Sequence, residues 1–438
     1  MSRLYFLIAL LLCVSGAYAQ TELKISESQS RVLSIEELFR LADENNRNIR
    51  AVSTAAEVAK EGVKTAKNAY LPAIDASLQF SYNGNGTITD RDFSHSFVAP
   101  IPHFGNNFSL EVSQVVFAGG AIRNGVKIAE LQQQIAALNA EQKRQEVHFL
   151  IAGNYLELCK LQNQLQVFES NIAQTQQVLE NMQAKVNQGI ALQNDITRYE
   201  LQLQNLNYAK IQLQNSMSLL NEQLTVAAGL PQSVVIVPDV ATVETWRAAS
   251  LQHPDPATTL AVQMAENAEK IAEHSEKISR AERLPQIALF AGDYLNGPVT
   301  IEIPALNKNF NYWAVGIGVK YSLGNLYKSG AKIQASHLAA RQANEEKAAL
   351  EEHISLALNE AFVHYKEAFV LLETKEKSVE LASQNYNVIS YRYENDLALI
   401  TDLLDAASQK LDTDLQAINA KINIVFNYYK IKYISGIL

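Results

Sequence analysis

Four segments of the chain alternate between apolar residues and polar or small ones. They cover residues 73–83, 107–117, 286–296 and 311–322. The clearest runs are Ile74, Ala76, Leu78, Phe80 and Tyr82, and Trp313, Val315, Ile317, Val319 and Tyr321. A period of two gives a β-strand one apolar face and one polar face. Each run has about ten residues, the length that crosses a lipid bilayer at a tilt. The pattern therefore predicts four strands of bilayer length.

Two very long segments show a helical pattern instead. From about Ala121 to Gln188 the sequence has no proline, and a matching run extends from about Leu326 to Tyr393. In the first run apolar residues recur at alternating spacings of three and four, as in a heptad seam: Leu158, Leu161, Leu165, Phe168, Ile172, Thr175, Leu179, Met182 and Val186. At 1.5 Å per residue, this run predicts a helix approaching about 100 Å. Its seam is narrow, so its other faces are expected to meet water.

The chain consists of two copies of one unit. Matching pairs of segments are 70–72 and 283–285, 123–128 and 328–333, Asp195 and Asp402, and 228–230 and 435–437. We therefore expect internal repeats at 33–230 and 255–437, joined by a segment that is rich in proline. Each repeat runs helix, β-hairpin, very long helix, break and helix.

The N-terminus has the features of a secretory signal peptide. Arg3 is followed by the apolar stretch Leu4 to Val14 and by the cleavage pattern Ala17-Tyr18-Ala19. We expect residues 1–19 to be removed and residues 20–438 to form the mature chain. Cys13 leaves lipidation open, although a leucine precedes it where a lipid-modification site has a small residue.

Beyond residue 20 no stretch approaches the roughly 20 apolar residues of a transmembrane helix. A membrane-spanning structure would therefore have to be a β-barrel, which leaves no strand edge in lipid. Four strands cannot close a barrel, because spanning barrels begin at about eight, so several chains would each contribute two hairpins. Candidates for the interfacial aromatic girdle are Tyr82, Phe108, Trp313 and Tyr321. The alternative is a soluble sandwich, for which no further strand pattern supplies the opposing sheet.

Composition narrows the functional classes. The formal charge is −9 without basic clusters, which argues against nucleic-acid binding. Cys159 is the one cysteine outside the signal peptide, so we expect a buried thiol and no internal disulfide. The sequence has no nucleotide-binding glycine loop, no His-Glu-x-x-His motif and no nucleophile constellation. We expect no enzyme activity, no metal site and no cofactor.

Three motifs follow one another in a fixed order along the duplicated chain, and the third is the first-repeat counterpart of the second. They are Val116-Phe117-Ala118-Gly119-Gly120, residues 391–396 followed by 402–406, and Gly189 with Asp195. Together with the order of elements, they resemble the TolC family of outer-membrane factors over nearly the whole mature chain. The resemblance implies a mostly α-helical protein with a membrane β-barrel. Three chains would form a 12-stranded barrel and a periplasmic α-helical tunnel, with Phe117, Gly119 and Gly120 at a strand-to-helix turn.

The same resemblance implies the exit duct of a tripartite efflux or type I secretion system. Such a duct is a passive homotrimeric channel in the lipid of the cell outer membrane, extends into the periplasm and is gated at its periplasmic tip. It opens when a periplasmic adaptor protein and an inner-membrane pump of the RND or ABC type dock. Family members export drugs, metals or polypeptides, and the sequence does not specify which. A cell-surface structural or adhesive coiled-coil protein is the alternative, but it leaves the paired strands unexplained.

Acidic residues in the tip segments are candidates for the gate. Asp402 and Asp405 are three apart and share one helix face. Three-fold symmetry would turn each into a carboxylate ring that favours cations and repels anions. They could equally be solvated acids near the start of a helix, where the helix dipole favours negative charge.

The resemblance also implies a latch between helix pairs, formed by Asp195 and Tyr393. A tyrosine hydroxyl that donates to a carboxylate would form such a link. The sequence departs from the family pattern at two positions: Ala398 replaces an arginine of some relatives, and Asp396 stands where glycine is usual. We therefore expect a gate that is held more by packing and less by ion pairing.

Overall fold

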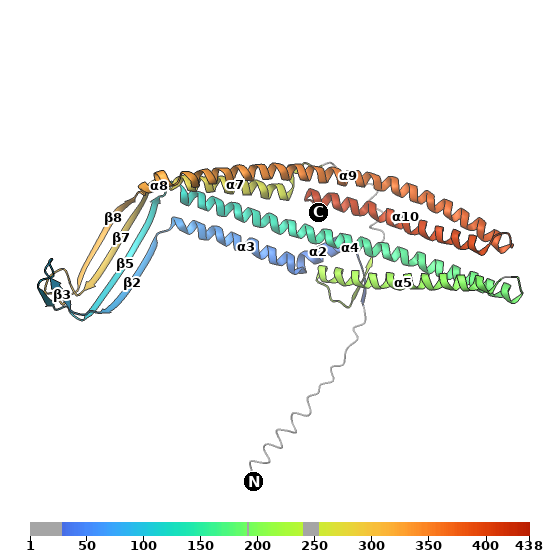
Figure 1. Cartoon of the computed structure of the whole chain (residues 1–438), viewed down its shortest axis with the longest axis horizontal. Helices are drawn as coiled ribbons and strands as arrows, with labels where there is room; N and C mark the ends of the chain where they lie inside the picture. The colour runs from blue at the N-terminus through green and yellow to red at the C-terminus, as the bar shows by residue number, and fades with distance from the viewer. Residues whose placement is uncertain (1–28, 191, 240–253) are drawn as a thin grey trace, which may run out of the picture.

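The computed structural model describes residues 29–190, 192–239 and 254–438. The molecule is elongated, with a β-sheet at one end and long helices that run from it to a tip at the other end (Figure 1). The expected signal peptide, residues 1–19, lies outside the described residues.

The two halves of the chain share a basic order of helix, hairpin, long helix and return helix, and each adds short elements of its own. The first half contains α2 (Ile35–Asn45), α3 (Arg47–Lys67), the 3-10 helix η1 (Asn68–Tyr70), β2 (Ala73–Tyr82), β5 (Phe104–Phe117), α4 (Ala121–Asn187) and α5 (Gln193–Ala228). The second contains the 3-10 helix η3 (Pro256–Thr258), α7 (Leu260–Ala281), β7 (Gln286–Gly297), β8 (Phe310–Lys320), α8 (Leu323–Lys328), α9 (Gly330–Glu394) and α10 (Ile400–Ser435). The long helices have 67 and 65 residues, and the return helices have 36 residues each.

Local sequence sets the helix ends. The Ser34 hydroxyl accepts a hydrogen bond from the Glu37 N–H at 3.2 Å and caps α2. Asp255 caps the 3-10 turn in which Pro256 is the first residue. The second long run is not continuous as expected, because Ser329 separates α8 from α9. The buried hydroxyl of Ser329 accepts from Arg283 Nε at 2.7 Å, which ties this break to the end of α7. No helix in the described ranges combines the length and apolar character needed to cross a membrane.

The four long strands form one antiparallel sheet in the order β2-β5-β7-β8. They lie at the four alternating segments, with ends within three residues of the expected bounds. The register aligns their apolar residues on one face, and one row across the sheet consists of Ile74, Val112, Ala291 and Val315. This face is uncovered in the single chain: Val315 is 72% exposed and Ile74 is 66% exposed.

The expectation of only four strands is wrong. A short hairpin of β3 (Gly86–Thr89) and β4 (Ser96–Ala99) lies in the loop between β2 and β5. In addition, β1 (Gln29–Leu33) pairs in parallel with β6 (Val234–Pro238). These strands have only four or five residues, too few for a clear period, and the parallel partners are far apart in the chain. Both are separate two-stranded sheets, so neither faces the four-stranded sheet as a sandwich partner.

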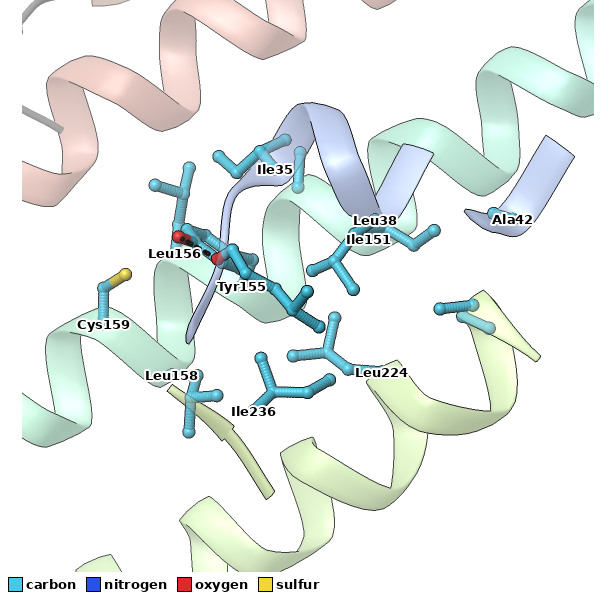
Figure 2. Close-up of a cluster of buried hydrophobic side chains, with 14 of the residues drawn as sticks. Ile35, Leu38, Ala42, Ile151, Tyr155, Leu156, Leu158, Cys159, Leu224 and Ile236 are labelled. Atoms are coloured by element: carbon cyan, nitrogen blue, oxygen red, sulfur yellow. Dashed lines mark hydrogen bonds between the residues drawn. The ribbon is translucent and has the colours of Figure 1, made fainter. Parts of the chain in front are cut away.

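The main hydrophobic core lies midway along the helices, where α2, α4, α5, α10 and β6 meet (Figure 2). The Tyr155 hydroxyl is buried in it. This hydroxyl donates to the Leu33 carbonyl at 2.9 Å and accepts from the Asp239 N–H at 2.8 Å, so it joins α4 to the β1–β6 pair. Cys159 is buried nearby, and burial raises the pKa of its thiol to about 12. The thiol is therefore a packing group, and the expected buried thiol is confirmed.

Replacing Tyr155 by phenylalanine should remove both of these hydrogen bonds and leave a buried carbonyl and a buried N–H without that partner. We expect a loss of about 2–3 kcal/mol of stability, seen as a lower midpoint of thermal unfolding in detergent solution. Tyr208→Phe is the control, because Tyr208 is 64% exposed on α5. Equal midpoints for the two variants would show that Tyr155 does not fasten the β1–β6 pair.

His148 of α4 makes the folding stability of the core depend on pH. Its ring stacks on Phe39 at 4.2 Å, and its Nε2 lies 2.9 Å from Asp43 Oδ1. Burial lowers the pKa of His148, and the Asp43 carboxylate only partly opposes this. The unfolded chain therefore binds this proton more readily than the folded chain.

The stability that His148 confers should be complete above its unfolded pKa of about 6.5 and should fall as the pH drops below it. In His148→Gln this part of the acid sensitivity should disappear. His337→Gln, at an exposed histidine of α9, should retain it. Thermal unfolding between neutral and mildly acidic pH provides the measurement, and an unchanged slope in His148→Gln would contradict the prediction.

Candidate functional site at the helical tip

The two helix pairs end beside each other at the tip, far from the sheet (Figure 1). A buried cluster joins them there, and its members come from α4, α5 and α10: Met182, Ile196, Tyr199, Ile400 and Leu403. Tyr386, Ile389 and Tyr393 of α9 pack against it. Burial of each large apolar side chain contributes about 1.5–3 kcal/mol. The tip is therefore held by packing across all four helices, and burial raises the pKa of the Tyr199 hydroxyl.

The first helix of each pair ends in the same way. The Ile190 N–H donates to the Lys185 carbonyl at 3.0 Å, and the Leu397 N–H donates to the Arg392 carbonyl at 2.7 Å. Each bond requires a residue in the left-handed conformation: Gly189 has φ +72° and Asp396 has φ +58°. Glycine adopts this conformation freely, whereas a residue with a Cβ loses roughly 1–2 kcal/mol. Asp396 therefore holds a costly position that its repeat partner fills with glycine.

The Asp396 side chain makes an ion pair across the two helix pairs. Lys185, in the last turn of α4, places its Nζ 2.7 Å from Asp396 Oδ1. The same Nζ lies 5.2 Å from the centre of the Tyr393 ring and 3.5 Å from the Tyr393 carbonyl oxygen. Lys185 is a quarter exposed and Asp396 is about two thirds exposed, so the pair is worth at most about 1 kcal/mol. It connects the end of α4 to the end of α9.

Sequence reasoning missed Lys185: it expected less ion pairing at the tip because Ala398 replaces an arginine of some relatives. The signal was present in the repeat. Lys185 precedes Gly189 by four residues, as Arg392 precedes Asp396, so both long helices carry a basic residue in the last turn. The repeat therefore indicated a basic residue near each helix end, but not that Lys185 of one helix pair contacts Asp396 of the other.

The two latch residues lie in the same region. Burial raises the pKa of the Tyr393 hydroxyl, and the carboxylates of Asp195 and Asp396 raise it further. Within the described part of the chain, no hydrogen bond joins the Tyr393 hydroxyl to Asp195. The two latch residues therefore lie near each other within a single chain. The direct contacts in this region are those of Lys185 with Asp396 and with the Tyr393 ring.

Asp402 and Asp405 are both exposed and flank the buried Leu403 on α10. Asp402 Oδ2 accepts from the Leu399 N–H at 3.1 Å, so this carboxylate caps the start of α10. Asp195 is the equivalent third residue of α5. Asp405 lies one turn further along and accepts from Gln409 Nε2 at 2.8 Å. Helix capping therefore involves Asp402 and not Asp405.

The remaining candidate residues lie in and beside the sheet. Gly119 and Gly120, which follow Phe117 at the end of β5, have φ values of +61° and +87° before α4 begins. A Cβ on Gly119 would lie 2.9 Å from Leu284 Cδ1, so the strand meets α4 in a tight joint. The four candidate girdle aromatics lie in different rows. Tyr82 is at the loop end of β2 and Tyr321 follows β8, whereas the register places Phe108 and Trp313 in the middle rows.

Two antiparallel hairpins, each continued by a very long helix pair, form the fold of outer-membrane channels. The chain is similar to VceC from Vibrio cholerae, with 12% sequence identity and a TM-score of 0.76. The match covers 92% of this chain and 96% of VceC. CusC is 13% identical, with a TM-score of 0.80 over 92% and 91%. CmeC from Campylobacter jejuni is 13% identical, with a TM-score of 0.75 over 92% and 85%.

Residues 38–230, which make up most of the first repeat, match the family described as outer membrane efflux protein. The expected resemblance is thereby confirmed. The description of this family places its members in the outer membrane. No curated protein sequence matches the chain.

The ion pair at the tip can be tested with a charge-removing variant that keeps the apolar stem. Lys185→Met should loosen the contact between the ends of α4 and α9. Hydrogen–deuterium exchange in peptides that cover residues 186–190 and 393–399 should accelerate by up to about fivefold. Lys377→Met is the matched control, because Lys377 pairs with Glu380 within α9 alone. Exchange at the tip that stays unchanged in Lys185→Met would show that the pair does not hold the helix ends together.

Proposed function

We propose that this protein is the outer-membrane exit duct of a tripartite efflux or type I secretion system. In this proposal it is a passive trimeric channel that is closed at its periplasmic tip and opened when an adaptor and an inner-membrane pump dock. The observation that carries the proposal is the four-stranded sheet, which has an uncovered apolar face and two unpaired edges.

In a single chain the sheet has, within the described residues, edge backbone groups without hydrogen-bond partners and an apolar face without a covering layer. Its edge strands β2 and β8 each leave a row of backbone groups unpaired, and its apolar face extends over all four strands. An exposed apolar surface of this kind marks an interaction site or a membrane contact. Lipid covers the face, but it tolerates no open edge, so copies must join edge to edge into a closed barrel. Three copies would give 12 strands, in keeping with the number in the resembling family.

The helices also have surfaces that another copy would cover. On α9, Leu356, Val363 and Val370 recur every seven residues and are exposed. On α5, Leu201 and Tyr208 have the same spacing and are also exposed. A heptad-spaced apolar row on a long helix is the pattern that packs against a neighbouring helix. Assembly of the sheets would bring such helices side by side and continue the barrel as a periplasmic tunnel.

The tip would be the gate of this tunnel. The buried cluster and the Lys185–Asp396 pair hold the two helix pairs of one chain together, so opening requires their separation. The sequence has no loop to bind nucleotide, and the energy for opening would come from the docked partners. Three copies would place Asp402 and Asp405 in carboxylate rings, which favour cations over anions. Asp405 is the better candidate because helix capping does not use its carboxylate.

Divalent-cation block in planar bilayers tests the rings. Removing both carboxylates in the double variant Asp402→Ala, Asp405→Ala should weaken block of the channel by divalent cations. The single variant Asp405→Ala should account for most of the change in block, because the Asp402 carboxylate is already engaged in capping α10. Glu380→Ala, an exposed acid of α9 away from the tip, should leave block unchanged. Equal block in wild type and in the double variant would remove the ring from the proposal.

A further inference from the structure

The polar face of the four-stranded sheet carries a row of aromatic rings. Tyr294 of β7 and Tyr312 of β8 are cross-strand partners, and their ring centres are 5.0 Å apart. Phe310 follows on the same face, 5.5 Å from Tyr312. Tyr312 and Phe310 are about half exposed, although their neighbours in these rows are Ser77, Ser109, Gln79 and Asn107. Large rings that remain open to water on a polar face are unusual and mark a surface that can receive a ligand.

Two carboxylates occupy the next row of the same face. Asp75 and Glu111 are cross-strand partners, and the row continues through Gly292 and Ala314. Tyr294 stands in the adjacent row of this face, two residues along β7 from the Gly292 that pairs with Glu111. Because Gly292 has no side chain, the Tyr294 ring can lie flat over it; a Cβ there would be 2.5 Å from the Tyr294 hydroxyl oxygen. The glycine thus lets the ring reach the carboxylate row.

The carboxylates have no cation beside them among the described residues. Neither Asp75 nor Glu111 takes part in an ion pair in the described ranges, and Lys320 is the one lysine or arginine in the four long strands. Lys320 is six residues along β8 from the row of Glu111, a distance of about 20 Å. The row therefore presents uncompensated negative charge beside exposed aromatic faces.

We propose that Tyr294, Tyr312 and Phe310, together with Asp75 and Glu111, form a binding site for aromatic organic cations. The inference rests on the proposed function, in which the apolar face of the sheet meets lipid and the polar face lines the lumen. The ring faces attract a cation and stack with an aromatic solute, and the carboxylates add charge attraction. Three copies would surround one solute from several sides. An anion or an aliphatic cation gains only part of these interactions.

The test is block of single-channel current in planar bilayers by benzyltrimethylammonium, added to the barrel side of the full-length protein. Tetramethylammonium has the same cationic head without the ring and is the control probe. We expect benzyltrimethylammonium to block at concentrations about fivefold lower than tetramethylammonium. Tyr312→Ala and Glu111→Gln should each remove most of this difference. Tyr312→Phe keeps the ring and should preserve it, and Tyr327→Ala at an exposed tyrosine of α8 is the matched control.

Two outcomes are decisive and distinct. If the protein forms channels but both probes block wild type equally, and Tyr312→Ala and Glu111→Gln leave block unchanged, the binding site is refuted while the channel stands. If the purified protein forms no conducting pore, the proposed function fails, and the site fails with it. If Tyr312→Ala does not assemble, the isosteric Glu111→Gln decides the question, because that variant keeps the size of the side chain.

Discussion

The structure depends on one constraint: a β-sheet with an apolar face and open edges cannot remain as it is in either water or lipid. Exposure of the apolar face to water is unfavourable, and unpaired backbone groups at the edges are unfavourable in lipid. The sheet of this protein has both features: the outer edges of β2 and β8 have no partner strand among the described residues, and an apolar face extends over all four strands. Closure through further copies satisfies both conditions together. The assembly that we propose for this protein rests on this constraint.

The helices extend this constraint over the length of the molecule. The tight joint at Gly119 fixes the start of α4 against the end of α7, and α4 then continues without a break to the tip. Edge-to-edge pairing of sheets would therefore also set the positions of the helix ends far away. At those ends the contact between helix pairs combines a buried cluster with a weak exposed ion pair. Most of the energy that holds these helix ends together is in the cluster, and a gate held more by packing than by ion pairing stays a prediction.

Much of the fold could be predicted because its signals are periodic. Alternation in β2 and β8 indicated strands, and the seam from Leu158 to Val186 indicated one continuous helix whose seam residues are buried or half-buried. The β1–β6 pair escaped notice because each strand is short and its partner is distant in sequence. The contacts of Tyr155 with this pair have no periodic signature either.

The candidate site was predicted less completely than the fold. Sequence reasoning placed the acids at the tip and recognised Asp396 as unusual, but it had no means to see that the α4 terminus turns Lys185 toward it. That contact depends on how two helix pairs pack, which neither repeat encodes alone. The row of aromatic rings on the polar face could not be predicted from the sequence for a similar reason. Only the register between β7 and β8 brings Tyr294 and Tyr312 together.

The central claim is that the sheet closes only when chains assemble in lipid. The most direct measurement is the mass of the purified mature protein in detergent, compared with its solubility after the detergent is removed. We predict a mass of three chains in detergent, and precipitation or reinsertion into lipid without it. A monomer that stays dissolved in plain buffer would contradict the account, because the apolar face and the open edges would then need neither lipid nor a neighbouring chain.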